Sequence, residues 1–380
     1  MKKNLLIAGI LCLAAFVDGQ KGLTSDPATP PSPPDLKTAY RKINPIGPRY
    51  QWENNDGYCG ETSLISAGLY YGQYVSQYDA RALGTSAKPK NSQVHHQLLL
   101  GDSNFSKSAT ALRLNYRQYS SINSRQFLKW VKKGVISGYP VIIGVFNNEK
   151  YFYDSTRRTA GDPEYDHIVP VIGWGSARKL NSDDITGDVL LFSDNGLLGD
   201  DKTAKPNKSV PYYFPYNIPY FMCSRATANS PTDINRKKRD NRIYALLQLP
   251  KYEDKGMDKN NYALLITGVK DPTHQTLPVR LTTSINYEAP FIADSSNTRP
   301  RAGKVTLAIT VSGLSVGQTY NLYDYTDERQ VPTKMFNRQS KNNKILPWRH
   351  FTAAATTWQG SLTIATSQKA FFRAVKATAE

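Results

Sequence analysis

The stretch NDGYCGETSLISAG, residues 55–68, joins a polar turn to the start of a helix. Asn, Asp and Gly are typical turn formers, and the apolar residues that follow recur at three- and four-residue spacing. Leu64, Ile65 and Leu69 begin this pattern, which continues to about Leu83 and predicts one long buried helix. Cys59 therefore stands where a loop turns into a helix.

The region that follows mixes helix and strand signals. The segment SRQFLKWVKKGV predicts a second helix, with Ser124 as its N-terminal cap and Phe127, Leu128 and Val131 as its buried stripe. Three short apolar runs then predict strands: PVIIGVF (140–146), HIVPVIGWG (167–175) and DVLLFSDN (188–195). A buried helix followed by a sheet indicates an α+β domain, which we expect to span residues 40–234.

A basic run, NRKKRDNR at residues 235–242, interrupts this pattern and is typical of a solvated linker. Beyond it, at residues 243–380, the signals predict strands alone, separated by Gly, Pro, Asn and Asp turns. These segments are RIYALLQL, NYALLITGV, VRLTTSINY, KVTLAITVSGL, QTYNLYDYT and SLTIATS. We therefore expect an all-β sandwich as a second domain.

The first 19 residues have the features of a secretory signal peptide. Lys2 and Lys3 precede an apolar run from Leu5 to Val17, and a small residue, Gly19, follows. Residues 20–39 form a Pro-rich leader that cannot become a helix or a central strand. We expect a secreted, extracellular protein with no transmembrane segment, since no second apolar run of sufficient length follows.

The chain is basic: 48 Lys and Arg stand against 31 Asp and Glu, a net charge of +17. Such a charge favours contact with anionic surfaces, including acidic glycans. No nucleic-acid-binding motif accompanies the charge, and the basic residues are scattered along the chain. We therefore expect an anionic surface or glycan, and no nucleic acid, as a partner.

Two cysteines remain after the signal peptide, Cys59 and Cys223. Exported proteins commonly pair their cysteines, so these two could form one disulfide. Alternatively, Cys59 stays a thiol for chemistry, which requires a lowered pKa because the thiolate is the nucleophile. The positive end of a helix and a nearby histidine both lower a cysteine pKa.

His167 is the histidine best placed to act with such a thiol. It opens the strand HIVPVIGWG, 108 residues beyond Cys59, where a side chain at the strand edge can face a cleft. The next strand ends in Asp194 and Asn195, and both residue types accept a hydrogen bond from an imidazole N–H. A nucleophile, a base and a group that orients the base are the parts of a nucleophilic hydrolase.

These three motifs resemble those of the papain-like cysteine peptidases: Cys59 in GYCGETS, His167 in DHIVPVIGWG, and Asp194 or Asn195 after the next strand. The likeness covers about residues 45–225 and is nearest to the branch of bacteriocin-processing peptidases that cleave double-glycine leaders. It implies peptide or amide hydrolysis through a thioester, with Cys59 as nucleophile and His167 as general base and then acid. In that branch the orienting residue is Asp, which favours Asp194 over Asn195.

The family also holds the reaction's oxyanion with a Gln side chain six residues before the cysteine. Here position 53 is Glu, and Gln51 lies eight residues before Cys59. The resemblance transfers this role to Gln51 across a longer loop, with Asn54 and Asn55 as substitutes. It implies a peptide or protein substrate and no cofactor or metal. The irregular Gln spacing favours an alternative, a non-catalytic extracellular binding protein on a degenerate peptidase scaffold.

Overall fold

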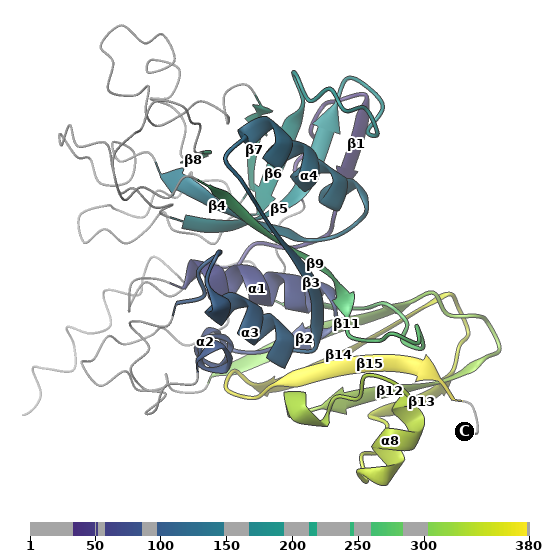
Figure 1. The fold of residues 1–380 in the computed structure, drawn as a ribbon. Helices are drawn as coiled ribbons and strands as arrows, with labels where there is room; N and C mark the ends of the chain where they lie inside the picture. The colour runs from purple at the N-terminus through teal and green to yellow at the C-terminus, as the bar shows by residue number, and fades with distance from the viewer. Residues whose placement is uncertain are drawn as a thin grey trace, which may run out of the picture.

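The computed structural model describes residues 33–49, 51, 58–85, 97–147, 167–193, 213–218, 244–246, 260–283 and 303–377. The predicted signal peptide, the predicted linker at 235–242, and Asp194, Asn195 and Cys223 lie outside the described residues. The described chain combines helices with antiparallel sheets, two of which face each other as in a sandwich (Figure 1). A mixed α+β fold with sandwich-like sheets is therefore confirmed.

The larger sheet has eight strands among the described residues, in the order β3-β9-β4-β5-β6-β7, with β1 paired to β5 and β8 paired to β4. Every described pairing in it is antiparallel. The strands are β1 (Tyr40–Ile43), β3 (Leu114–Ser121), β4 (Val141–Asn147), β5 (His167–Ser176), β6 (Val189–Ser193), β7 (Tyr213–Asn217), β8 (Tyr244–Ala245) and β9 (Asn261–Val269). The three strands predicted at 140–195 thus form the centre of this sheet as β4, β5 and β6.

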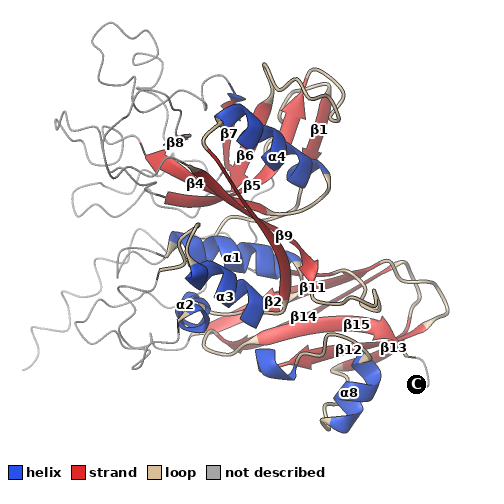
Figure 2. Cartoon of the chain, in the orientation of Figure 1, coloured by secondary structure: helices blue, strands red, loops and turns tan. Residues whose placement is uncertain are grey.

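Helices cover both faces of this sheet (Figure 2). Helix α4 (Ser124–Ile136) packs on one face, where its apolar stripe joins Val169 and Val171 of β5 in a buried core. Helices α1 (Cys59–Tyr70), α2 (Gln77–Gly84) and α3 (Ser103–Ala111) lie on the other face, in a core that includes Ile168. Because strand side chains alternate between faces, β5 contacts α1 and α4 with successive residues.

The long helix predicted from Cys59 to Leu83 is wrong. Helix α1 ends at Tyr70, and Gly72 adopts a left-handed φ of +71°, which favours glycine. The chain then forms the short strand β2 (Gln73–Tyr74) before α2 begins. The Ser76 side chain caps α2 by accepting a hydrogen bond from the Asp79 N–H. The apolar spacing continues across this break, which is why it reads as one helix.

The C-terminal strands form two further sheets. One has the order β10-β11-β14 and the other β13-β12-β15-β2. Their bounds are β10 (Val279–Thr282), β11 (Lys304–Ser312), β12 (Thr319–Tyr325), β13 (Arg349–Thr352), β14 (Thr357–Ala365) and β15 (Ala370–Lys376), with η4 (Glu328–Gln330) and α8 (Phe336–Asn342) following β12. Leu307 and Ile309 of one sheet and Leu322 and Phe372 of the other share one buried core, as in a sandwich.

The two halves of the chain exchange strands. Strand β9, which follows the predicted linker in sequence, lies between β3 and β4 in the larger sheet. Conversely, β2 of the N-terminal half pairs with β15, and Tyr74 joins the sandwich core. The predicted boundary at 235–242 stays a prediction, but residues 243–380 supply more than a separate sandwich. As a result α1, α2 and α3 lie between the larger sheet and the sandwich (Figure 1).

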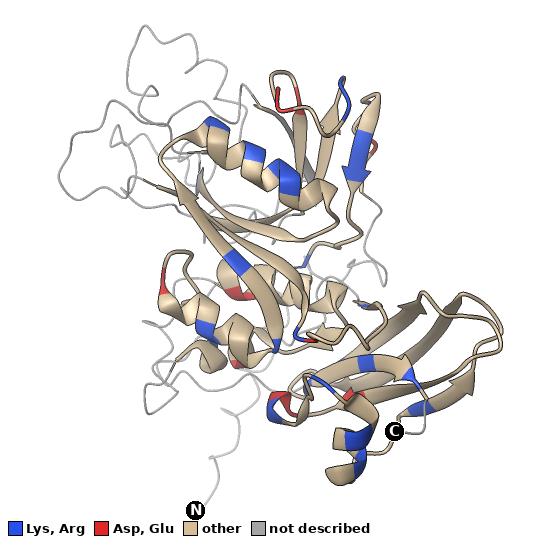
Figure 3. Cartoon of the chain, turned by 45° about the vertical axis from the view of Figure 1, so that its right-hand side comes forward, with Lys and Arg blue, Asp and Glu red and all other residues tan. Residues whose placement is uncertain are grey.

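None of the described helices is long and apolar enough to cross a membrane. Lys and Arg occur on α4, on α8 and on several strands, with Asp and Glu between them (Figure 3). This distribution agrees with the scattering of basic residues along the sequence.

Candidate active site

Cys59 is the first residue of α1, as the sequence predicts. It is half-buried and carries a thiol, so it is not half of a disulfide in the described structure. The residue before it, Tyr58, occupies the N-cap position and supplies no side-chain hydrogen bond to the helix. Its carbonyl oxygen accepts the first helical hydrogen bond, 2.9 Å from the Thr62 nitrogen.

The start of α1 packs against the start of β5. The backbone N–H of Ile168 is hydrogen-bonded to the Cys59 sulfur and lowers the pKa of the thiol. One turn along α1, the Ser63 hydroxyl donates to the Ile168 carbonyl oxygen over 3.1 Å. A Cβ on Gly60 would lie 3.2 Å from Ile168 Cδ1, so the two elements are in direct contact. The fold thus brings Cys59 to the residue that follows His167 in the chain.

His167 is the first residue of β5 and pairs with Val145 of β4. It is buried, with 1% of its surface exposed, whereas its place at the strand edge predicts a side chain that can face a cleft. Neighbouring strand β6 ends at Ser193, and Phe192 lies opposite Val171 of β5. The residues predicted to orient the imidazole, Asp194 and Asn195, follow directly in sequence but lie outside the described residues.

Gln51 is buried, and its Oε1 has no hydrogen-bond partner among the described residues. Its role in holding an oxyanion stays a prediction. The substitutes Asn54 and Asn55 lie outside the described residues. In the part of the chain that the structure describes, no three His, Cys, Asp or Glu side chains are grouped so that they could hold a metal ion.

The electrostatics of the thiol differ from the expectation. The helix start was expected to lower the pKa of Cys59, but burial raises it to about 12, and the negative charge of Glu61 contributes further. The N–H groups of Ile168 and Gly60 and the charge of Arg81 oppose this rise. Although the residue keeps some exposed surface, the atoms packed around its sulfur exclude water, and desolvation is the larger effect. Cys59 is therefore a neutral thiol near pH 7.

Two charged residues near the thiol are not predicted as site residues from the sequence. Glu61 of α1 and Arg81 of α2 form a buried ion pair of 2.6 Å, and Glu61 Oε1 also accepts a hydrogen bond from the Leu98 N–H. The sequence indicates Glu61 only as a suitable first-turn residue. The sequence signal that could have identified it is a single charge within GETSLISAG, residues 60–68, because a charge in an otherwise uncharged helix requires a partner if that helix is buried.

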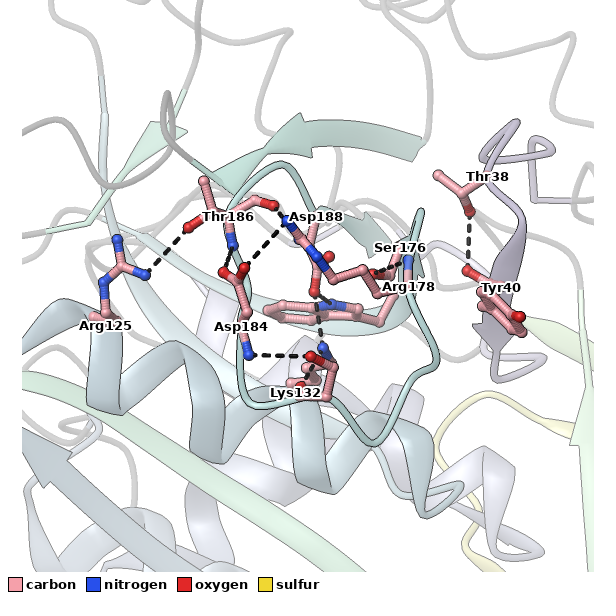
Figure 4. A network of polar contacts seen from close by, with 11 residues as sticks. Thr38, Tyr40, Arg125, Lys132, Ser176, Arg178, Asp184, Thr186 and Asp188 are labelled. Carbon is pink, nitrogen blue, oxygen red and sulfur yellow. Dashed lines mark hydrogen bonds and ion pairs between the residues drawn. The ribbon is translucent and has the colours of Figure 1, made fainter.

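A second buried ion pair lies on the α4 face of the sheet. Lys132 Nζ is 2.9 Å from Asp188 Oδ2, which also accepts a 2.8 Å hydrogen bond from the indole N–H of Trp174. Figure 4 shows this network, in which Lys132 also donates to the Ser182 carbonyl oxygen. The network therefore joins α4 to β5 and to the residue before β6.

The described geometry provides a sulfur at a helix start, two backbone N–H groups directed at it, and a histidine in the adjoining strand. No family model, no curated protein and no solved structure matches this chain.

Proposed function

We propose that the chain is a secreted cysteine hydrolase that cleaves peptide or related amide bonds through a thioester, with a papain-like arrangement. The observation that carries the proposal is the hydrogen bond between the Ile168 N–H and the Cys59 sulfur. It brings a cysteine at a helix start to Ile168, the residue that follows His167, although the two elements are far apart in the chain. Their order and setting are those of the family that the sequence resembles.

In the proposed reaction His167 takes the thiol proton as the Cys59 sulfur attacks the substrate carbonyl carbon. The oxyanion of the tetrahedral intermediate is held by the Cys59 backbone N–H and the Gln51 side-chain amide. The amine leaves with the proton from His167, and a thioester remains on Cys59. Water then gives a proton to His167 and attacks the thioester, which releases the acid and restores the thiol.

A neutral thiol fits this sequence of steps, because the proton moves to His167 during the attack. Asp194, or Asn195 in its place, would orient the imidazole by accepting its N–H. The fold is compatible with a substrate-binding or positioning role for the sandwich, which packs on the same helices, α1, α2 and α3.

Alkylation by iodoacetamide near pH 7 tests the proposal on the full chain. We expect Cys59 to be labelled faster than Cys223, and expect His167→Ala to slow Cys59 labelling. His167→Gln provides a second variant because the imidazole is buried, and thermal unfolding checks that both variants fold. Equal, slow labelling of both cysteines in the wild type would contradict the proposal.

A peptide-library assay measures the reaction itself. Cys59→Ser should lower kcat by about 10³-fold or more, as expected for the loss of a nucleophile. Cys223→Ser is the matched control and should retain activity. Cleavage that persists in Cys59→Ser would exclude the assigned nucleophile.

The raised pKa of Cys59 favours one alternative, a non-catalytic extracellular binding protein on a degenerate peptidase scaffold. A desolvated thiol with a pKa near 12 is typical of an inert structural cysteine. The net charge of +17 would then serve to hold an anionic glycan. Slow labelling together with salt-sensitive binding to an immobilised sulfated polysaccharide, equal in wild type and Cys59→Ser, would favour this alternative.

A further inference from the structure

A buried ion pair joins the first turn of α1 to α2. Arg81 Nε of α2 is 2.6 Å from Glu61 Oε1 of α1, and the two side chains are 0% and 1% exposed. Burying two charges costs desolvation free energy that their attraction does not always repay, so such a pair is weak evidence for stability. Its location, two residues from Cys59, is more informative than its energy.

Each partner of the pair also holds a neighbour of Cys59. The Arg81 guanidinium carbon lies 3.7 Å from the centroid of the Tyr58 ring, the geometry of a stacked cation–π contact. Glu61 Oε1 accepts a second hydrogen bond, of 3.0 Å, from the Leu98 N–H. The Leu98 carbonyl oxygen lies only 2.0 Å from the place where a Cβ on Gly60 would be. The residues before and after Cys59 are therefore fixed by the pair or by the backbone that it binds.

The two charges also act on the thiol, with opposite signs. Glu61 raises the pKa of Cys59 and Arg81 lowers it. Both groups are buried, so salt screens their effects little. The other buried pair of the described structure, Lys132–Asp188, contacts Trp174 on the α4 face and is not among the causes of the Cys59 shift. The Glu61–Arg81 pair thus changes the pKa of the thiol, and the Lys132–Asp188 pair provides a comparison.

We propose that the Glu61–Arg81 pair is the positioning element of the candidate active site, which holds the backbone at Tyr58–Gly60 so that the Cys59 sulfur stays against the Ile168 N–H. The role of this pair in catalysis rests on the proposed function. Arg81 suits this role because its planar guanidinium stacks on Tyr58 while its Nε donates to Glu61, and lysine cannot do both.

Three variants of the full chain test the inference. Glu61→Gln keeps an acceptor oxygen for Arg81 and Leu98 but removes the charge. Arg81→Lys keeps the charge but removes the stacked guanidinium. Asp188→Asn changes the other buried pair and is the matched control. The measurements are the rate of iodoacetamide labelling of the Cys59 peptide as a function of pH, by mass spectrometry, and the thermal unfolding temperature.

We expect Glu61→Gln to speed Cys59 labelling by about threefold or more at a fixed pH below the thiol pKa, since half a pKa unit is about a threefold change in thiolate. Arg81→Lys should also speed labelling, because a loosened helix start exposes the sulfur to the reagent. Asp188→Asn should lower the unfolding temperature and leave the labelling rate unchanged. Tyr58→Leu replaces Arg81→Lys if the latter does not fold, with the same expectation.

Two results would overturn the inference: folded Arg81→Lys and Tyr58→Leu that are labelled at the wild-type rate, or an equal change in Asp188→Asn. Hydrolysis is measured separately on the same proteins, and a positioning role predicts a lower kcat with KM unchanged. Altered labelling in a protein without hydrolase activity would refute the proposed function and keep the positioning role. Wild-type hydrolysis with unaltered labelling in the variants would refute the positioning role alone.

Discussion

Helices α1 and α4 pack on opposite faces of β5 and are built in different ways. Helix α4 buries one apolar stripe and exposes charged residues such as Arg125 and Lys133 on its other side. Its N-terminus is capped by the Asn123 side chain, which accepts a 3.0 Å hydrogen bond from the Gln126 N–H. In α1, residues 60–68 are all buried, and no side chain caps its start.

This difference shows where each helix obtains its specificity. An amphipathic, capped helix such as α4 is largely specified by its own sequence. A helix buried on all sides depends on its neighbours, and three polar residues of α1 have a partner outside the helix. Glu61 binds Arg81, Thr62 donates to Gln77, and Ser63 donates to Ile168. Substitutions in α4 should therefore change stability alone, and those at the start of α1 should also change the thiol.

The largest expected effect is a loss of stability that distinguishes the Lys132–Asp188 pair from the Glu61–Arg81 pair. Lys132→Met leaves the Asp188 carboxylate buried without its cation, which should lower the free energy of unfolding by about 3–5 kcal/mol. Labelling of Cys59 in the folded protein should be unchanged, because the pair lies on the α4 face of the sheet. Urea denaturation measures the free energy of unfolding, and mass spectrometry measures the labelling rate. A loss below about 1 kcal/mol would contradict a buried ion pair at this position.

The next effect concerns the close approach of α1 to Leu98. Gly60→Ala places a Cβ 2.0 Å from the Leu98 carbonyl oxygen, and relief of this overlap should cost about 1–3 kcal/mol of stability. It should also change the Cys59 labelling rate, because the helix start must move.

Gly68→Ala in the same helix is the control for Gly60→Ala. Its Cβ would meet Gln73 at an ordinary 3.6 Å, and alanine is favoured over glycine within a helix by about 1 kcal/mol. The control should therefore be neutral or stabilising in urea denaturation. Equal losses in both variants would show that the approach of Leu98 to Gly60 is unimportant.

The buried thiol should make stability depend on alkaline pH. The folded pKa of Cys59, about 12, lies above its ordinary value of 9.0, so the folded state holds the proton more tightly than the unfolded state. This contribution is complete below pH 9 and is lost as pH rises toward about 12, by at most about 1.4 kcal/mol per pH unit.

Comparing the wild type with Cys59→Ser isolates the contribution of the thiol, because other groups titrate equally in both proteins. The difference in urea midpoints should be constant from pH 7 to 8 and should change above pH 9. A difference that stays constant through pH 10.5 would indicate that the thiol is less buried than the structure shows.

The smallest expected effect is the loss of the α4 cap. Asn123→Ala removes the acceptor for the Gln126 N–H and should cost about 1 kcal/mol. Because α4 is separate from the thiol, labelling of Cys59 should not change. Asn123→Asp keeps an acceptor at the same position and should retain the stability in thermal unfolding. A labelling change in Asn123→Ala would contradict the separation of the two helices.

Local patterns predict much of the secondary structure. Helix α4 spans residues 124–136, against 124–135 from its apolar spacing, and β9 has the limits 261–269 of the segment NYALLITGV. The cap is shifted by one residue, because Asn123 and not Ser124 accepts the first-turn N–H. Helix α4 is predictable because its one buried face repeats with the period of the helix, and β9 because a continuous apolar run is typical of a strand buried on both faces.

Elements that depend on distant partners are not predictable in this way. Strand β2 is two residues long and exists by pairing with β15, where Tyr74 lies opposite Ala370. Strand β3 leaves every residue after Leu114 exposed or half-buried, and it is completed by pairing with β9. The Glu61–Arg81 pair likewise joins two helices that the sequence presents as one.

The sequence by itself determined that a cysteine begins a helix, that a histidine opens an apolar strand, and that the chain combines an α+β region with further strands. Only the tertiary structure decided that Cys59 meets the residue after His167, that β9 enters the larger sheet, and that the thiol is neutral. The reason is physical: backbone periodicity is encoded locally, whereas strand pairing and desolvation depend on which distant surfaces are brought together.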